Sequence, residues 1–282
     1  PWSRPSRADL GRLLGWTSPL ALWSVCGVLI SGVDIFIVGA IDPGQLGPYA
    51  VALALIALPS GVATALATAW LPALAQADKI SPSSTSLATA RATTLTAGLL
   101  ALGGIPFVAL APLVVRLWAG PGDVGTGVSS LQILYVAAAL RYLFLPWVSA
   151  VVVADRQHVL LLTPALEAGV NLAASIGGGL VLGAPGVAVG TLLGALAAAL
   201  INLNRNMSRL KEVGPDRADF LRSIARARTP IALAVAACVS STLTGMTPFG
   251  VGVALACSAV GLVWTWRTLT TISLAPPGLA DS

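Results

Sequence analysis

The feature that most constrains the fold is the stretch of residues 159–204, in which Glu167 is the only charged residue. A membrane-spanning helix needs about 20 apolar residues, so this stretch is long enough for two. The sequence Gly183-Ala184-Pro185-Gly186 divides it, and glycine and proline favour turns over helix interiors. We therefore expect two spans joined by a tight turn.

The first of these two spans combines polar and small residues. Glu167, Asn171 and Ser175 recur every four residues, so on a helix they share one face. Small residues also recur every four positions: Gly169, Ala173 and Gly177 in the first span, and Gly186, Gly190 and Gly194 in the second. Small residues at this spacing let two helix backbones approach closely in a bilayer. We expect the two spans to pack antiparallel through the two small stripes, with the polar face turned away from lipid.

The rest of the chain has the same apolar character. Of its 282 residues, 56% are hydrophobic and 10% are charged, whereas a soluble domain carries about 25% charged residues. Six charge-poor blocks are long enough to span a membrane: residues 13–41, 43–77, 92–115, 124–154, 159–204 and 229–265. The last two are each long enough for two spans. We predict an all-α, polytopic membrane helix bundle of about eight transmembrane helices.

The basic residues predict the orientation. With the N-terminus in the cytoplasm, every one of the 16 lysines and arginines is cytoplasmic except Arg116, outside, and Arg141, within a span. Such an excess is typical of cytoplasmic loops. We expect a multi-pass protein of the cell membrane with both termini inside and membrane lipid around it. Because this loop bias accounts for the net charge of +5, we expect no nucleic-acid partner.

Three charged residues fall inside predicted spans: Asp34, Arg141 and Glu167. An ionisable group at that depth costs at least about 2.5–3.5 kcal/mol, so it faces a cavity or a partner. We predict a substrate or ion pathway along these residues, extended by the polar side chains of Asn171, Ser175 and Asn202. The alternative is an internal ion pair that fixes the helix contacts, and the sequence leaves open which acid pairs with Arg141.

No motif indicates an enzyme. Residues 183–191 lack the lysine and the preceding strand of a phosphate-binding loop. The three cysteines, Cys26, Cys238 and Cys257, lie apart in predicted spans and fit neither a disulfide framework nor a metal site. We expect no catalytic residue, no metal and no cofactor.

A basic segment divides the chain. Residues 1–210 form the predicted six-helix lobe, residues 211–229 a basic cytoplasmic linker, and residues 230–282 two additional spans and a short tail. Within the linker, Asp216 and Asp219 indicate the start of a short amphipathic helix. That helix lies on the inner membrane surface, or the segment is a solvated linker.

Several stretches resemble the multidrug/oligosaccharidyl-lipid/polysaccharide (MOP) flippase superfamily. DIFIVG at residues 34–39 and LGPYAVA at 46–52 are similar to the first helix pair of a lobe, and WLPAL at 70–74 resembles the proline-marked exit of the next helix. EAGVNL at 167–172 and GVAVGT at 186–191 resemble the asparagine-containing helix and the helix start that close a lobe. The resemblance covers roughly residues 10–210.

The resemblance implies a transporter built from two six-helix lobes around a central cavity, expected in the bacterial inner membrane. This chain supplies one lobe and two further spans, which match the second lobe and last helices of a polysaccharide or O-antigen flippase. The likeness between residues 7–12 and 217–222 suggests instead a first lobe followed by a truncated second. In either arrangement the expected partner is a missing second lobe or a second copy of the chain.

The activity implied is the export of lipid-linked oligosaccharide or polysaccharide precursors, including those of lipopolysaccharide, by ion-coupled alternating access. Arg141 would attract the anionic lipid diphosphate or an acidic sugar, while Asp34 and Glu167 would carry the coupling proton or sodium ion. One alternative is a MATE-type antiporter of small cationic drugs, in which the acids bind the cation and Arg141 only pairs with one of them. Another is a non-transporting, half-size membrane scaffold.

Overall fold

The computed structural model describes residues 6–120 and 124–234, together with single positions at 236, 256, 260, 263 and 267. Its described elements are all helices, which confirms the all-α prediction. Five helical segments are long and apolar enough to cross a membrane: Ala21–Ile41, Pro43–Ile80, Gly125–Val153, Gln157–Leu182 and Ala184–Arg209. The chain is a polytopic membrane helix bundle. The two spans expected within 230–282 lie almost entirely outside the described residues.

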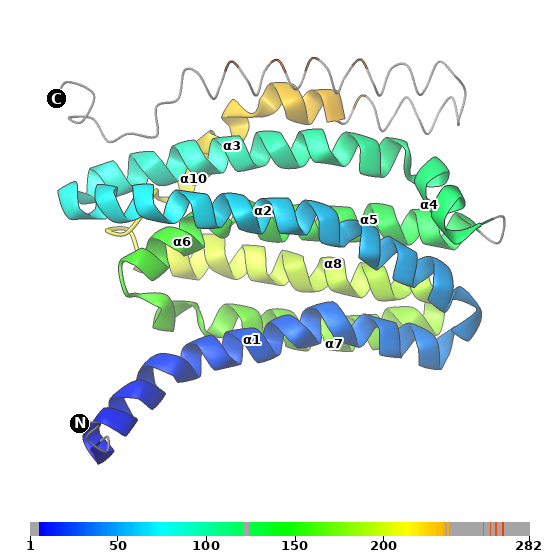
Figure 1. Ribbon diagram of the computed structural model, residues 1–282, viewed down its shortest axis with the longest axis horizontal. Helices are drawn as coiled ribbons and strands as arrows, with labels where there is room; N and C mark the ends of the chain where they lie inside the picture. The colour runs from blue at the N-terminus through cyan, green and yellow to red at the C-terminus, as the bar shows by residue number, and fades with distance from the viewer. Residues whose placement is uncertain are drawn as a thin grey trace, which may run out of the picture.

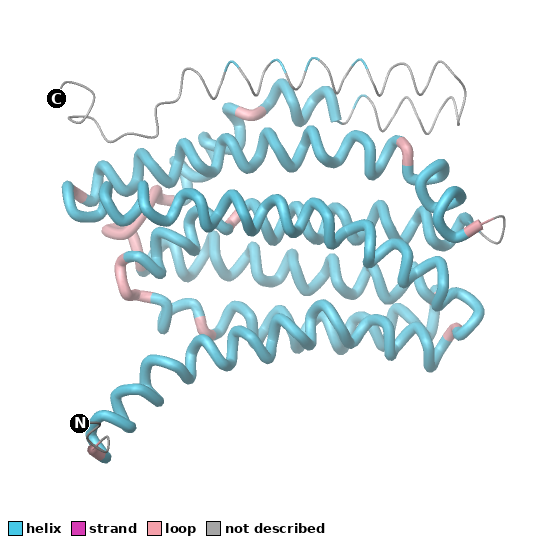
Figure 2. Tube along the Cα trace, in the orientation of Figure 1, coloured by secondary structure: helices cyan, strands magenta, loops and turns pink. Residues whose placement is uncertain are grey.

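The elements follow one another along the chain as α1 (Arg7–Ile41), η1 (Pro43–Gln45), α2 (Leu46–Ile80), α3 (Pro82–Ala109), α4 (Ala111–Ala119), α5 (Val124–Leu143), α6 (Leu145–Val153), η2 (Gln157–Leu160), α7 (Leu162–Leu182), α8 (Ala184–Ile201), η3 (Asn202–Asn206), α9 (Met207–Arg209) and α10 (Arg217–Arg226). The long helices run side by side, with α1 and α7 at one edge, α3 and α10 at the other, and α2, α5 and α8 between them (Figure 1). The connections between helices are short and gather at the two ends of the bundle (Figure 2).

Prolines divide two of the predicted spans. The span expected over 92–115 falls on α3 and α4, and the one over 124–154 falls on α5 and α6; Pro112 and Pro146 lie in the first turns of the second helices. Proline suits a first helical turn because its missing N–H has no partner there anyway.

Pro72 lies inside α2, which continues to Ile80, so the prediction that Pro72 marks the helix exit is wrong. The region 92–115 is also not among the five segments that meet the length and hydropathy needed to cross a membrane.

The basic segment contains the predicted short helix, α10. The Asp216 side chain accepts a hydrogen bond from the backbone N–H of Asp219 at 2.7 Å, as a helix N-cap does. Its apolar face packs on the bundle rather than facing outward, since Phe220 is 1% exposed and stacks on Phe144 with ring centroids 4.8 Å apart. Together with Trp147 and Met207, these rings form the core at the end of the bundle where α8 ends.

Candidate functional site

Helices α7 and α8 make a very tight backbone contact around a single turn residue, Gly183. A Cβ atom added at Gly186 would overlap the carbonyl oxygen of Gly178, and one at Gly190 would overlap the backbone of Ser175. A Cβ at Gly194 would also come within 2.9 Å of the Cβ of Asn171. The glycines of α8 therefore have the packing role that their spacing predicts.

The small stripe of α7 does not share this role. Gly169, Ala173 and Gly177 are exposed, and nothing lies within 4 Å of a Cβ added at Gly169 or Gly177. The prediction for these three residues is therefore wrong. The glycines of α8 meet the polar face of α7 instead, because turning that face inward keeps its side chains away from lipid and leaves the small stripe on the outside.

The first cluster of predicted site residues surrounds Asp34 of α1. Its carboxylate is 1% exposed. Thr191 of α8 donates a hydrogen bond to Oδ2 at 2.6 Å and the Tyr49 hydroxyl of α2 donates to the same atom at 3.2 Å. The other oxygen, Oδ1, is buried and has no hydrogen-bond partner among the described residues.

Asn171 and Ser175 extend this cluster along α7. The Ser175 hydroxyl lies 2.8 Å from the Asn171 Oδ1 and 3.1 Å from the Val187 carbonyl oxygen. The Thr191 hydroxyl lies 3.4 Å from the same two acceptors, and the Asn171 amide donates to the carbonyl oxygen of Ile30 at 3.3 Å. A hydroxyl has one proton to donate, so these oxygen atoms outnumber the hydrogens available to them. The cluster is therefore rich in hydrogen-bond acceptors.

The second cluster contains the ion pair that the sequence left open. The Nε of Arg141 on α5 lies 2.6 Å from the Oε1 of Glu167 on α7, so Arg141 pairs with Glu167 rather than with Asp34. The Glu167 side chain is 7% exposed and that of Arg141 is 30% exposed. The Nη2 atom of Arg141 is buried and makes no hydrogen bond within the described part of the chain.

A cavity of 310 Å³ lies beside this ion pair, enclosed by α1, α5, α6, α7 and α8. Asn202 also lines it, so this residue belongs with Arg141 and Glu167 rather than with Asp34. The Asn202 Oδ1 accepts hydrogen bonds from the Thr163 hydroxyl at 3.2 Å and from the Asn206 amide at 2.8 Å. The predicted pathway thus divides into two neighbouring sites that share α7, an oxygen-rich cluster and a charged cavity.

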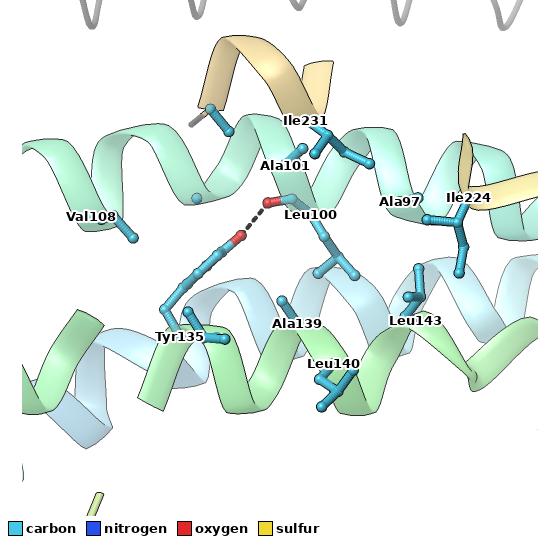
Figure 3. Close-up of a pocket in the computed structure, with 13 residues that line it drawn as sticks. Ala97, Leu100, Ala101, Val108, Tyr135, Ala139, Leu140, Leu143, Ile224 and Ile231 are labelled. Atoms are coloured by element: carbon cyan, nitrogen blue, oxygen red, sulfur yellow. Dashed lines mark hydrogen bonds between the residues drawn. The ribbon is translucent and has the colours of Figure 1, made fainter. Parts of the chain in front are cut away.

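A second cavity, of 450 Å³, lies between α3, α5 and α10. The described residues that line it include no charged side chain. Figure 3 shows Tyr135 reaching across from α5 to α3, where its hydroxyl donates a hydrogen bond to the Leu100 carbonyl oxygen. This cavity is apolar and offers no group that would attract an ion. Among the residues that the structure describes, no group of three or more histidines, cysteines or acids could hold a metal.

Four polar residues of these clusters were not predicted as site residues: Tyr49, Thr163, Thr191 and Asn206. Two of them lie in the stretches that carry the family resemblance, since Tyr49 belongs to LGPYAVA and Thr191 ends GVAVGT. The resemblance was therefore a signal for these two. Thr163, inside the predicted stretch 159–204, and Asn206, just beyond it, carried no comparable signal.

Comparison with known proteins identifies the fold. No family model matches the chain, and no curated protein matches it. Among solved structures, the chain is similar to "Lipid II flippase MurJ, inward closed conformation", with a TM-score of 0.71 and 15% sequence identity over 95% of this chain. The chain spans 57% of the length of that flippase. It is a multi-pass membrane protein whose fold is similar to the fold of that flippase.

Proposed function

We propose that the chain forms part of an ion-coupled membrane transporter that flips lipid-linked oligosaccharide or polysaccharide precursors. The observation that carries the proposal is the Arg141–Glu167 pair at the wall of a 310 Å³ cavity. It supports the proposal because an intramembrane charge is costly and is kept where it serves a substrate or ion pathway. The likeness in fold to a lipid II flippase agrees with this class of substrate.

Arg141 is the residue that would bind the diphosphate of the carrier lipid. Glu167 engages its Nε atom, which leaves the Nη donors to face an anion. Guanidinium groups bind phosphate oxygens through paired, charge-assisted hydrogen bonds. Glu167 would act as the residue that positions the guanidinium and balances its charge while the cavity is empty of substrate.

The cluster around Asp34 would bind the coupling ion. Its acceptor-rich composition suits a proton or a monovalent cation such as sodium, because a single carboxylate among neutral oxygens balances one positive charge. Asn171 belongs to this cluster and Glu167 to the cavity, and the two lie four residues apart on α7, which is about 6 Å along a helix. An ion at one site and a substrate at the other would therefore act on the same turn of α7 during alternating access.

The alternatives are less well supported. A guanidinium at the cavity wall disfavours a cationic drug as substrate, which weighs against a MATE-type antiporter. A scaffold does not need a buried carboxylate such as that of Asp34. An unpartnered buried oxygen lowers the stability of the folded state and adds no contact to it. A complete transport path needs a second lobe, from another polypeptide or from a second copy of this chain.

The test is a flipping assay on the native protein reconstituted into vesicles, with a lipid diphosphate that carries a fluorescent sugar as the probe. The double variant Arg141→Gln/Glu167→Gln removes both charges of the pair and leaves neither unpaired. In the assay, a membrane-impermeant reductant quenches the labelled lipid that reaches its side of the membrane. We expect this quenching to be at least tenfold slower with the double variant than with the unmodified protein. Arg116→Gln, at an exposed arginine of α4, is the matched control and should transport normally. Normal transport by the double variant would show that the pair only fixes helix contacts.

The coupling site has its own test in the same assay. Asp34→Asn retains an oxygen that can accept from Tyr49 and Thr191, and it removes the charge. We expect transport by this variant to lose its response to an imposed sodium or proton gradient. A gradient response equal to that of the unmodified protein would exclude Asp34 as the coupling group.

A further inference from the structure

We infer that the end of the bundle where α8 gives way to α10 binds an anionic phospholipid, with its phosphate headgroup in a pocket between η3, α9 and the start of α10. This pocket has a volume of 490 Å³. None of its lining residues belongs to the Arg141 cavity or to the Asp34 cluster. The inference therefore does not depend on the proposed transport function.

Positive charge exceeds negative charge in the lining of the pocket. Lys211 and Arg217 line it and are exposed. The Arg217 Nη1 donates to the Asn204 Oδ1 at 2.9 Å, so a neutral side chain holds the guanidinium in place. Within the described residues, neither cation forms an ion pair with a carboxylate; the ion pairs seen there join Arg141 to Glu167 and Arg222 to Asp219.

The acid in the pocket lining, Asp216, is already engaged. Its Oδ1 caps α10 by accepting from the backbone N–H of Asp219 at 2.7 Å. The two cations outnumber this single carboxylate, so the pocket keeps a positive charge that favours a phosphate group.

An apolar track leading away from the pocket identifies the source of that phosphate as a lipid. Leu193, Leu196 and Leu200 of α8 are 45%, 41% and 57% exposed, and Leu203 lines the pocket itself. Their spacing of three and four residues places them on one helix face. From Leu193 to Leu203 the helix rises about 15 Å, which is half of the roughly 30 Å hydrocarbon core and so matches the depth of one leaflet.

The predicted orientation agrees with this assignment. The basic segments are expected on the cytoplasmic side, where the leaflet carries anionic lipids and where basic pockets beside membrane helices bind their headgroups. The exposed Leu221 of α10, which also lines the pocket, faces the same space as Leu203. The pocket thus offers charge to a headgroup and apolar surface to the first part of an acyl chain.

The experiment uses the full chain in phosphatidylcholine vesicles that contain a small fraction of spin-labelled phosphatidylglycerol, and measures the motionally restricted lipid fraction. We expect Lys211→Gln/Arg217→Gln to lower the relative association of phosphatidylglycerol at least fivefold. The matched control is Arg226→Gln/Arg228→Gln, which removes the same charge from two exposed arginines outside the pocket. This control should keep most of the association. Unchanged helix content and elution volume show that each variant is folded.

Three outcomes would overturn the inference. An equal loss in both double variants would mean that general surface charge, rather than the pocket, attracts the lipid. Displacement of the spin-labelled lipid by millimolar inorganic phosphate or by the chain-free headgroup glycerophosphoglycerol would mean that the site takes a free phosphate. No restricted fraction in the unmodified protein would mean that no lipid binds there.

Discussion

The two sides of the bundle are held together in different ways. On the side of α7 and α8, helix backbones touch through Gly178, Gly186 and Gly190. On the side of α3 and α5, a 450 Å³ apolar cavity separates the helices and Tyr135 bridges the gap with its side chain (Figure 3). The two polar clusters lie on the first side, and the apolar cavity defines the second.

The difference has a physical cause. Burial of apolar surface gives no drive for helix association in lipid, so close packing and hydrogen bonds must hold helices together. Polar groups need fixed partners at fixed distances, and direct backbone contact between α7 and α8 provides them. An apolar contact imposes no such demand, and a cavity between α3 and α5 can be filled by hydrocarbon at little cost.

The largest expected effect tests the backbone contact itself. Gly190→Ala places a Cβ atom on the backbone of Ser175, where no side-chain movement can relieve the overlap. We expect a loss of about 3 kcal/mol in the free energy of unfolding, measured by denaturant titration in mixed micelles. Gly177→Ala, which meets nothing within 4 Å, is the control and should change stability by less than about 1 kcal/mol. Equal losses in both variants would refute the one-sided packing.

A smaller effect is expected from breaking the ion pair. Glu167→Gln leaves the Arg141 guanidinium without its carboxylate at the cavity wall, and we expect a loss of about 1–3 kcal/mol. Arg141→Gln/Glu167→Gln should recover most of that loss, because no charge is then left unpaired. The same denaturant titration measures both. If the double variant is less stable than Glu167→Gln, the two residues are not coupled as a pair.

On the looser side, a side-chain hydrogen bond joins α3 to α10. The Thr94 hydroxyl lies 2.9 Å from the carbonyl oxygen of Ser223 and 3.0 Å from that of Ala90 in its own helix. The Ser223 carbonyl is one of the last four of α10, which lack intrahelical donors. Thr94→Val should therefore cost about 1 kcal/mol and speed hydrogen exchange at the amides of α10. Thr96→Val is the control, since Thr96 donates to Ala92 within its own helix. Faster exchange in the control alone would contradict this assignment.

The smallest effect is expected inside the apolar cavity. Ala139 lines it, so Ala139→Leu adds volume where space exists and should change stability by less than about 1 kcal/mol. Ala137, two residues earlier on α5, is 1% exposed, and Ala137→Leu should cost about 1–3 kcal/mol by overpacking. Thermal unfolding of the two variants side by side measures the difference. A cost for Ala139→Leu as large as for Ala137→Leu would mean that the cavity closes in the membrane.

The sequence predicted the α7–α8 hairpin well because several signals coincide there. Three signals agree with the same pair of antiparallel helices: the turn signal at residues 183–186, the polar stripe of Glu167, Asn171 and Ser175, and the glycines of α8. The stripe of Gly169, Ala173 and Gly177 misled because a spacing of four identifies a face but not what that face meets. In the structure the polar stripe is buried against α8, and the small stripe is exposed on the opposite side of α7.

The partner of Arg141 could not be predicted for a related reason. Which acid an arginine meets depends on the rotation of α5 about its axis and on where α1 and α7 lie around it, and the sequence of α5 gives no indication of the latter. Hydropathy also continues through Pro112 and Pro146, so the breaks between α3 and α4 and between α5 and α6 stayed hidden. Orientation across the membrane remains a prediction, as do the boundaries of the lobe, linker and terminal pair.

The hydrogen bonds of Asp34 have a consequence for the synthesis of the protein. Tyr49, its partner from α2, follows only 15 residues later, whereas Thr191 from α8 follows 157 residues later. At 5–20 residues per second, the second partner emerges from the ribosome roughly 8 to 30 s after Asp34. Throughout that interval Tyr49 is the one of these two partners that is available to the carboxylate of the nascent α1. We therefore expect α1 to stay beside the insertion machinery or in contact with water until α8 arrives.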